Sequence, residues 1–227
     1  MSADTVAAAV SALVALACTA ILGSRLAARD RGCAPLIAWT TGFALFTVAS
    51  ACLWHGAARG WGEDVYRLYY LAGGILVVPF LAVGELLLVL PGRRVSRLAA
   101  ATMLWLTFAS AAAVLAADVD HEALASAGAA PPNHVLGGPW TTILAISVNS
   151  VGTIVILAGT LQSARGRRDW RPLLVAAGVA VIGLASTATR FDVYALFALG
   201  QAAGIVLILA GLIAPGRARR RPAPAPG

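Results

Sequence analysis

The sequence predicts an all-α membrane protein in which seven transmembrane helices form one bundle. Of its 227 residues, 59% are hydrophobic and only 12% are charged, which is about half the charged fraction usual in soluble domains. The apolar residues gather in long segments, each long enough to cross the roughly 30 Å apolar core of a bilayer as a helix. None of these segments alternates as barrel strands do, so helices must satisfy the backbone groups in lipid.

Seven apolar segments mark the predicted spans. They cover approximately residues 5–24, 35–56, 67–91, 97–117, 139–162, 172–190 and 193–214. Together they make one membrane domain over residues 1–214, and a basic, Pro-rich cytoplasmic tail follows over residues 215–227. No basic region precedes the first apolar segment, so we expect a retained span rather than a cleaved signal peptide. The longest connection, residues 118–138, is predicted to be a loop with one short amphipathic turn.

The distribution of arginine predicts the orientation of the bundle. All 17 basic residues are arginine, and most of them lie in alternate connections and in the tail. Because positive charge is retained on the cytoplasmic side, the N-terminus is predicted outside and the C-terminus inside. The arginines on the predicted inner side are Arg25, Arg29, Arg31, Arg93, Arg94, Arg97, Arg165, Arg167, Arg168, Arg171, Arg217, Arg219, Arg220 and Arg221.

Two groups of three helices share short sequence signals. Residues 28–36 (ARDRGCAPL) and 164–173 (ARGRRDWRPL) are both basic and both end in Pro-Leu, and the triplet Asp-Val-Tyr occurs at 64–66 and again at 192–194. The two groups run in the same direction and the fourth helix joins them, which predicts a parallel 3+1+3 repeat. The alternative is that Ala- and Leu-rich helices and basic loops are alike by chance. The layout resembles that of SWEET-type sugar transporters, although their Pro-Gln helix signature is absent here.

Polar and charged residues gather at the predicted outer ends of the second, third, sixth and seventh helices. One interpretation is a site for a small anionic ligand, built on Arg67 and Arg190. The other is a set of interfacial salt bridges that hold the helix ends together. The candidate ligand-binding residues are His55, Asp64, Arg67, Tyr70, Arg190 and Asp192.

Glu85 is a carboxylate inside the third predicted span. An ionisable group within a membrane helix is costly unless paired, so it is a candidate for proton or ligand coupling. It lies near the inner end of its span, and a structural pair with Arg97 or Arg25 is the alternative. A regular α-helix brings residues 18 positions apart onto one face. We therefore expect Arg67 and Glu85 to share a face, unless Pro79 kinks the helix.

Asn149 and Gln201 form a predicted polar layer within the membrane. They lie at similar depths, counted from the outer ends of their helices. Such groups either bond one helix to another or contact a ligand. The pair Gly200 and Gly204 permits close packing of the last helix against a neighbour.

Several chemistries are excluded by what the sequence lacks. Without lysine there is no retinal Schiff base, and all three histidines belong to the predicted outer side, so no pair could ligate haem across the membrane. Motifs for a nucleophilic serine, a zinc protease or a phosphate loop are absent. We expect no cofactor, no metal and no catalytic residues. The arginines lie between apolar segments, so the lipid bilayer is the expected partner and nucleic acid is not.

One segment resembles known proteins. The sequence YRLYYLAGG at 66–74, followed by Val77-Val78-Pro79 and Gly84, resembles a segment of uncharacterised actinobacterial multi-helix integral membrane proteins. This resemblance implies a bacterial plasma-membrane protein and brings no known activity. The seven-helix plan is also similar to the sensor regions that precede some bacterial histidine kinases.

These observations favour a non-enzymatic, sensor-like or accessory membrane protein. Its outward-facing polar pocket would bind a small ligand, and its output would pass through a partner membrane protein. The alternative is a small-solute transporter, possibly proton-coupled through Glu85, that is built on the three-helix repeat. A membrane-embedded enzyme is less favoured, because no nucleophile and base are paired.

Overall fold

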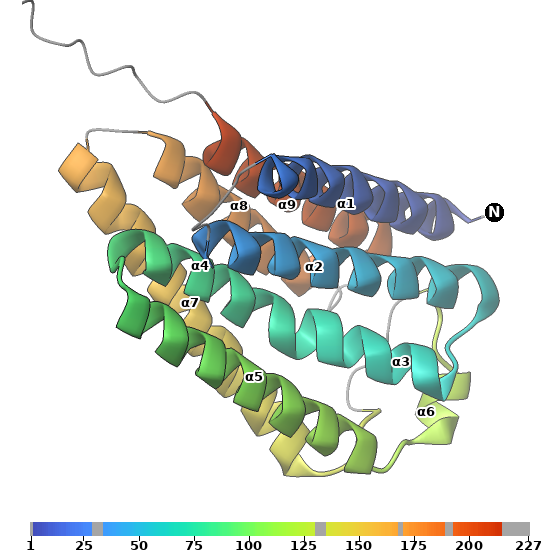
Figure 1. Ribbon diagram of the computed structural model, residues 1–227. Helices are drawn as coiled ribbons and strands as arrows, with labels where there is room; N and C mark the ends of the chain where they lie inside the picture. Colours follow the sequence, from blue (N-terminus) through green and yellow to red (C-terminus); the bar gives the residue numbers. More distant parts are fainter. Residues whose placement is uncertain (1, 29–33, 130–134, 168–169, 189–192, 215–227) are drawn as a thin grey trace, which may run out of the picture.

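The computed structural model of the chain describes residues 2–28, 34–129, 135–167, 170–188 and 193–214 (Figure 1). Every extended regular element in these ranges is a helix, and one isolated bridge joins Val119 to Leu136. The predicted all-α class is therefore confirmed. The elements are α1 (Ala3–Ala27), α2 (Ala34–Arg59), α3 (Glu63–Tyr69), η1 (Tyr70–Leu76), α4 (Val77–Val89), α5 (Arg93–Ala116), α6 (His121–Ala125), α7 (Pro139–Arg167), α8 (Arg171–Ala188) and α9 (Tyr194–Ile213).

Six described helices are long and apolar enough to cross a membrane, which makes this a multi-pass membrane protein by length and composition. They are α1, α2, the continuous helix Glu63–Val89, α5, α7 and α9. The helix Glu63–Val89 consists of α3, η1 and α4, and we call it the α3–α4 helix. The sixth predicted span, residues 172–190, corresponds to α8, which is apolar but shorter than the other six helices. The predicted amphipathic turn in the longest loop is the short helix α6.

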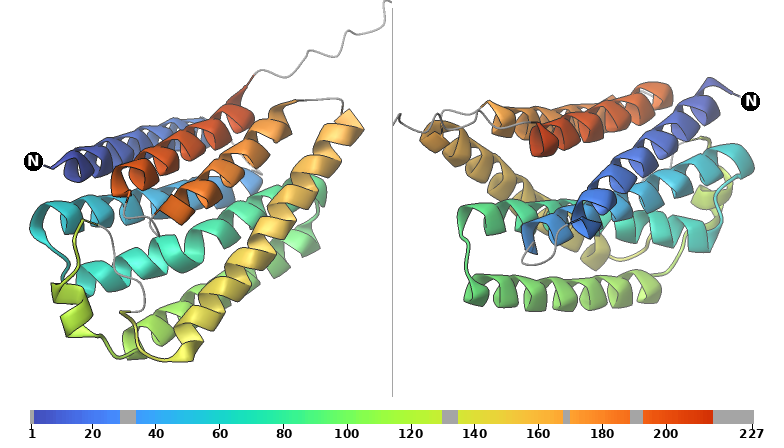
Figure 2. Two further views of the ribbon diagram at one scale, coloured as in Figure 1. Left: turned by 180° about the vertical axis from the view of Figure 1, so that it is seen from behind. Right: turned by 45° about the horizontal axis from the view of Figure 1, so that its top comes forward.

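Six helices form a closed ring, and α5 lies outside it. Following the contacts around the ring, α1 packs on α2, α2 on the α3–α4 helix, α4 on α7, α7 on α8, α8 on α9, and α9 on α1 (Figures 1 and 2). α5 contacts η1, α4 and α7 from outside. Large apolar side chains of α5, such as Trp105 and Phe108, are more than two-thirds exposed, as expected for a surface that faces lipid.

Glycines let α8 and α9 pack backbone against backbone. A Cβ atom at Gly178 would lie 2.6 Å from the Gly204 carbonyl oxygen, and one at Gly204 would lie 2.8 Å from the Gly178 carbonyl oxygen. Gly200 similarly meets Ala185 on α8. The predicted packing role of Gly200 and Gly204 is therefore confirmed. Small residues give this close approach its van der Waals contacts in lipid, where no hydrophobic effect holds helices together.

A π-helical segment interrupts the α3–α4 helix just before Pro79. The Val77 N–H donates to the carbonyl of Ala72, five residues back, rather than four. A π-turn carries more residues than an α-turn and rotates the residues that follow. The expected shared face of Arg67 and Glu85 is consequently lost: Arg67 reaches α5, whereas Glu85 packs on α7. The prediction failed because the 18-residue rule assumes an unbroken α-helix.

The glycine contacts generate a prediction with a matched control on the same helix. Gly178→Ala should lower the free energy of unfolding by about 1–3 kcal/mol, because its new methyl group overpacks the backbone of α9. Gly183→Ala should be neutral or slightly stabilising, because a Cβ atom there meets nothing within 4 Å. Unfolding titrations in mixed micelles measure both values. Equal stabilities of the two variants would show that α8 and α9 are not in backbone contact.

Candidate functional site

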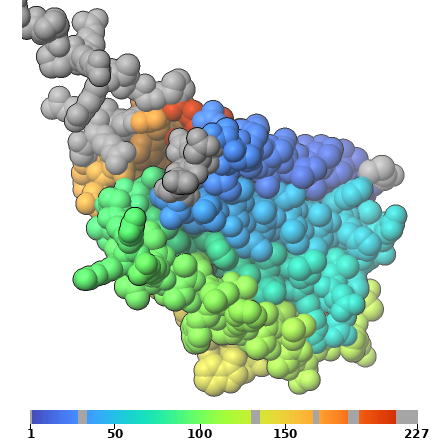
Figure 3. Space-filling view, in the orientation of Figure 1, coloured from blue at the N-terminus to red at the C-terminus, as the bar shows by residue number. Residues whose placement is uncertain are grey.

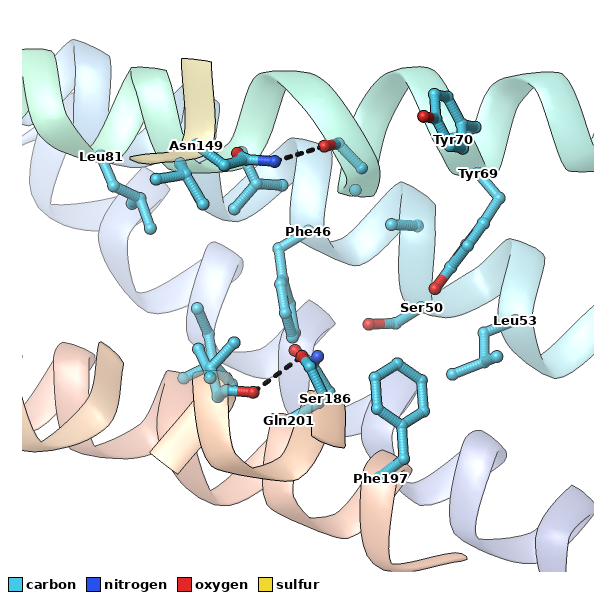
Figure 4. Close-up of a pocket in the computed structure, with 18 of the residues that line it drawn as sticks. Phe46, Ser50, Leu53, Tyr69, Tyr70, Leu81, Asn149, Ser186, Phe197 and Gln201 are labelled. Carbon is cyan, nitrogen blue, oxygen red and sulfur yellow. Dashed lines mark hydrogen bonds between the residues drawn. The ribbon is translucent and has the colours of Figure 1, made fainter. Parts of the chain in front are cut away.

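A cavity of about 580 Å³ lies inside the ring, towards the end of the bundle that carries α6. All six ring helices line it, together with Leu136 from the segment that follows α6 (Figure 4). Its volume is in the range of pockets that hold small molecules, which is about 300–1,000 Å³. The uncharged polar side chains among its lining residues are Ser11, Ser50, Tyr66, Tyr69, Tyr70, Thr142, Asn149, Thr153, Ser186 and Gln201.

The remaining walls of the cavity are apolar. Phe46 and Leu53 from α2 face Phe197 and Ile205 from α9, and Leu81 lines the cavity from α4. No arginine, aspartate or glutamate is among the lining residues that the structure describes. Apolar walls with a few converging hydrogen-bonding groups suit an uncharged ligand, because a charged ligand would remain unpaired in a site of low dielectric constant.

Asn149 bonds α7 to the backbone of the π-helical segment. Its Nδ2 donates to the Gly74 carbonyl at 2.6 Å (Figure 4). In the π-helical pattern the donor to this carbonyl would be the residue five positions on, which is Pro79 and has no N–H. A backbone carbonyl in the membrane needs a donor, and the Asn149 side chain supplies one. We infer that the Asn149 side chain replaces the backbone donor that Pro79 cannot supply.

The other end of the Asn149 amide is buried between the helices. Its Oδ1 accepts no hydrogen bond from the residues that the structure describes. Buried polar atoms without a partner are rare in folded proteins. The Asn149 side chain lines the cavity and is fixed by its bond to Gly74, so it is a rigid part of the cavity wall.

Gln201 lies across the cavity from Asn149. It projects from α9 beside Ser186 of α8, whose hydroxyl donates to the Ile182 carbonyl at 2.9 Å (Figure 4). On a third side, the hydroxyl groups of Tyr69 and Ser50 point towards each other and into the cavity. A ligand in the centre would meet hydrogen-bonding groups on several walls.

Aromatic rings cover the end of the cavity nearest α6. Tyr66 and Tyr70 are stacked with ring centroids 6.2 Å apart, and Trp61 packs edge-on against Tyr69 at 5.4 Å. Leu136 closes this end from the loop side and is 6% exposed. The three tyrosines thus combine a cover of apolar rings with hydroxyl groups in the cavity wall.

Comparison of the chain with protein-family models, with curated proteins and with solved structures finds no match. What the site can do therefore follows from its own geometry. It is a membrane-embedded cavity with oriented, uncharged hydrogen-bonding groups, which suits the binding of a neutral molecule with several polar atoms.

Of the four members of the predicted outer cluster that the structure describes, only Tyr70 lines this cavity. Arg67 forms an ion pair with Glu63 at 2.9 Å and donates to the backbone carbonyls of Val114 and Ala117, the latter at 2.9 Å. A cation at these carbonyls satisfies the C-terminal end of α5 and opposes its helix dipole. His55 and Asp64 are exposed. Arg190 and Asp192 lie outside the described residues, so a ligand role for this cluster stays a prediction.

Of the three intramembrane polar residues predicted from the sequence, two line the cavity and one does not. Asn149 and Gln201 both line the cavity. Glu85 does not, although it is only 4% exposed. It lies against α7 at Gly159, where a Cβ atom would come within 2.6 Å of the Glu85 Cγ. Gly159 therefore makes room for the carboxylate, and a coupling role for Glu85 stays a prediction.

Ser50, Tyr69 and Ser186 are cavity residues that the sequence did not single out. Serine is common in membrane helices and usually bonds to its own helix, as Ser186 does. Their convergence depends on how the six ring helices are arranged, and no local pattern carries that information. The depth and spacing of polar residues, which identified Asn149 and Gln201, was the available signal.

A double-mutant cycle tests the bond between Asn149 and Gly74. Asn149→Leu should destabilise the protein by about 0.6–2 kcal/mol, because the Gly74 carbonyl loses its donor. In a Pro79→Ala background the N–H at position 79 is restored and can serve that carbonyl, so Asn149→Leu should cost less. Unfolding titrations of the wild-type chain, the two single variants and the double variant give the interaction energy between positions 79 and 149. Strictly additive effects would contradict the assignment of Pro79 as the cause.

Arg67 generates a prediction about α5. Arg67→Gln should accelerate hydrogen exchange in the last turn of α5, because two carbonyls lose a cationic donor. Glu63→Gln is the control, since the Glu63 side chain is 41% exposed and its loss leaves the bonds from Arg67 to α5 in place. Hydrogen–deuterium exchange with mass spectrometry measures both. An unchanged rate in Arg67→Gln would rule out this role.

Proposed function

We propose that this chain is a carrier for an uncharged solute, which it binds in the central cavity and passes across the membrane. The observation that carries the proposal is the position of the cavity. It lies between α1, α2 and the α3–α4 helix on one side and α7, α8 and α9 on the other, and both groups line it. We call these groups the first and second units. Transporters built from two repeats bind their substrates at the interface between the repeats.

The order of helices around the ring supports an internal repeat. Pairing α1 with α7, α2 with α8, and the α3–α4 helix with α9 carries every contact of the ring onto another contact of the ring. For example, the α1–α2 contact corresponds to α7–α8, and the α4–α7 contact corresponds to α9–α1. This is the relation expected of two parallel units about an axis along the membrane normal, with α5 as the connection.

The cavity residues repeat at fixed intervals in the two units. In the α3–α4 helix and in α9 the matching residues are each 128 positions apart, the same interval that separates the two Asp-Val-Tyr triplets. These pairs are Tyr69 with Phe197, Gly73 with Gln201, and Val77 with Ile205. In α2 and α8 the interval is 133 positions, about one helical turn less than the 137 positions between Pro35 and Pro172, and the pairs are Phe46 with Val179, Ala49 with Ile182, Ser50 with Gly183, and Leu53 with Ser186.

The proposal includes seven spans in a bacterial plasma membrane, with the N-terminus outside and the C-terminus inside. α8 belongs to the ring and is apolar, so its place in the repeat supports a crossing despite its shorter length. The arginine distribution supports the orientation. With this orientation the cavity lies in the outer half of the membrane, below α6 and the aromatic cover.

Transport is favoured over sensing because both units contribute to one site between them. Rocking one unit against the other would open the site to either side in turn, with the contact between α4 and α7 as part of the moving interface. A sensor or accessory component would bind the same solute without moving it. Measurement of solute flux separates these two functions.

Flux through reconstituted liposomes tests the proposal. The probes are three labelled uncharged compounds: glycerol, a hexose and a fluorescent glucosyl diacylglycerol. The protein should move at least one of them, and Gln201→Leu should slow that movement by about tenfold, because one ligand hydrogen bond is lost. Thr107→Val is the control, since it removes a hydroxyl from α5, outside the ring. No protein-dependent movement of any probe, or equal rates in the two variants, would contradict the proposal.

A further inference from the structure

The cavity is closed on the α2 side of the ring and exposed on the α8 side. The four lining residues of α2 have exposed fractions of only 5–7%. Of the four matching residues of α8, Gly183 and Ser186 are exposed although they line the cavity. The two sets have the same spacing along their helices.

The helices next to α2 and α8 explain this difference. α1 and α2 form a continuous surface in the space-filling view (Figure 3). α7 and α8 lie close together near the loop that joins them and then diverge towards the other end of α8 (Figures 1 and 2). A Cβ atom at Gly183 would meet nothing within 4 Å. Among the described residues, the cavity thus has a lateral opening between α7 and α8, which we call the α7–α8 opening.

The α7–α8 opening joins two chemically different regions. The outer surfaces of the two helices are apolar and face the lipid: Val151 and Ile154 on α7 are 62% and 65% exposed, and Leu184 on α8 is 70% exposed. Inside it, Asn149 and Gln201 present amide groups. A molecule in the opening would contact hydrocarbon at one end and hydrogen-bonding groups at the other.

We propose that the ligand is a neutral amphiphile that enters sideways from the membrane, specifically a lipid with an uncharged, hydroxyl-bearing head group such as a glycolipid. This inference rests on the proposed carrier function and names its substrate class. The head group occupies the cavity, where the side chains of Gln201 and Ser50 form hydrogen bonds with its hydroxyl groups. The apolar chain stays in the bilayer and passes through the α7–α8 opening. No charged side chain among the described lining residues pairs with an ionic head group, so the head group is uncharged.

Flipping of a fluorescent glucosyl diacylglycerol tests this inference. Dithionite bleaches only the outer leaflet of liposomes, so protein-dependent flipping appears as additional loss of fluorescence. Gly183→Leu should reduce flipping to the level of protein-free liposomes, because the new side chain fills the opening. Gly23→Leu on α1 should flip at the wild-type rate, since its Cβ atom also meets nothing within 4 Å. Thermal unfolding checks that both variants are folded.

A second variant separates blocking of the α7–α8 opening from an effect on folding, because it is modified only after the protein has folded. In Gly183→Cys, a bulky maleimide added after reconstitution should stop flipping at once, and the same reagent should leave the wild-type chain active. Hexose uptake is measured with each chain. If hexose moves but the glycolipid does not, or if flipping is insensitive to the block at 183, lateral access is overturned while the carrier function stands. If hexose, glycolipid and glycerol all fail to move, both proposals fail. A block that changes only the oligomeric state would assign the opening to a second copy of the chain.

Discussion

The hydrogen bond from Asn149 to the Gly74 carbonyl is the contact on which the architecture depends. In lipid, a backbone carbonyl without a donor is costly, and Pro79 has no N–H to offer the Gly74 carbonyl beside the cavity. The π-helical turn and the asparagine on α7 together resolve that problem. The same bond joins the two units and fixes one amide in the cavity wall. The bond to the Gly74 carbonyl thus links three features: the π-turn in the α3–α4 helix, the contact between the two units and a polar group in the cavity wall.

The two units differ in how closely their first two helices pack, so the cavity is closed beside α2 and open beside α8. α1 covers α2, whereas α7 diverges from α8, so equivalent lining positions are buried in one unit and exposed in the other. The site has a polar interior, an aromatic cover at the α6 end and an apolar surround at the α7–α8 opening. These features favour a neutral ligand with both polar and apolar parts. Arg67 contributes from outside the ring by holding the end of α5.

Local properties of the sequence predicted much of the fold and part of the site. Hydropathy depends only on neighbouring residues, so the helices and the all-α class could be predicted, as could the close packing at Gly200 and Gly204. Asn149 and Gln201 were identified by depth alone. The shared face of Arg67 and Glu85 was not correctly predicted, because a π-turn shifts the register. Ser50 and Ser186 could not be identified, since only the arrangement of the six ring helices brings them to one cavity.

The most direct test of the central claim is the reactivity of single cysteines on α9 with a water-soluble thiol reagent in intact membranes. Gln201→Cys places a thiol in the cavity, and Leu199→Cys places one at nearly the same depth on the lipid-facing side, where Leu199 is 48% exposed. The wild-type chain gives the background from its own cysteines. We predict rapid labelling of Gln201→Cys and background labelling of Leu199→Cys. If Gln201→Cys were as unreactive as Leu199→Cys, α9 would face no solute-accessible cavity and the account would be wrong.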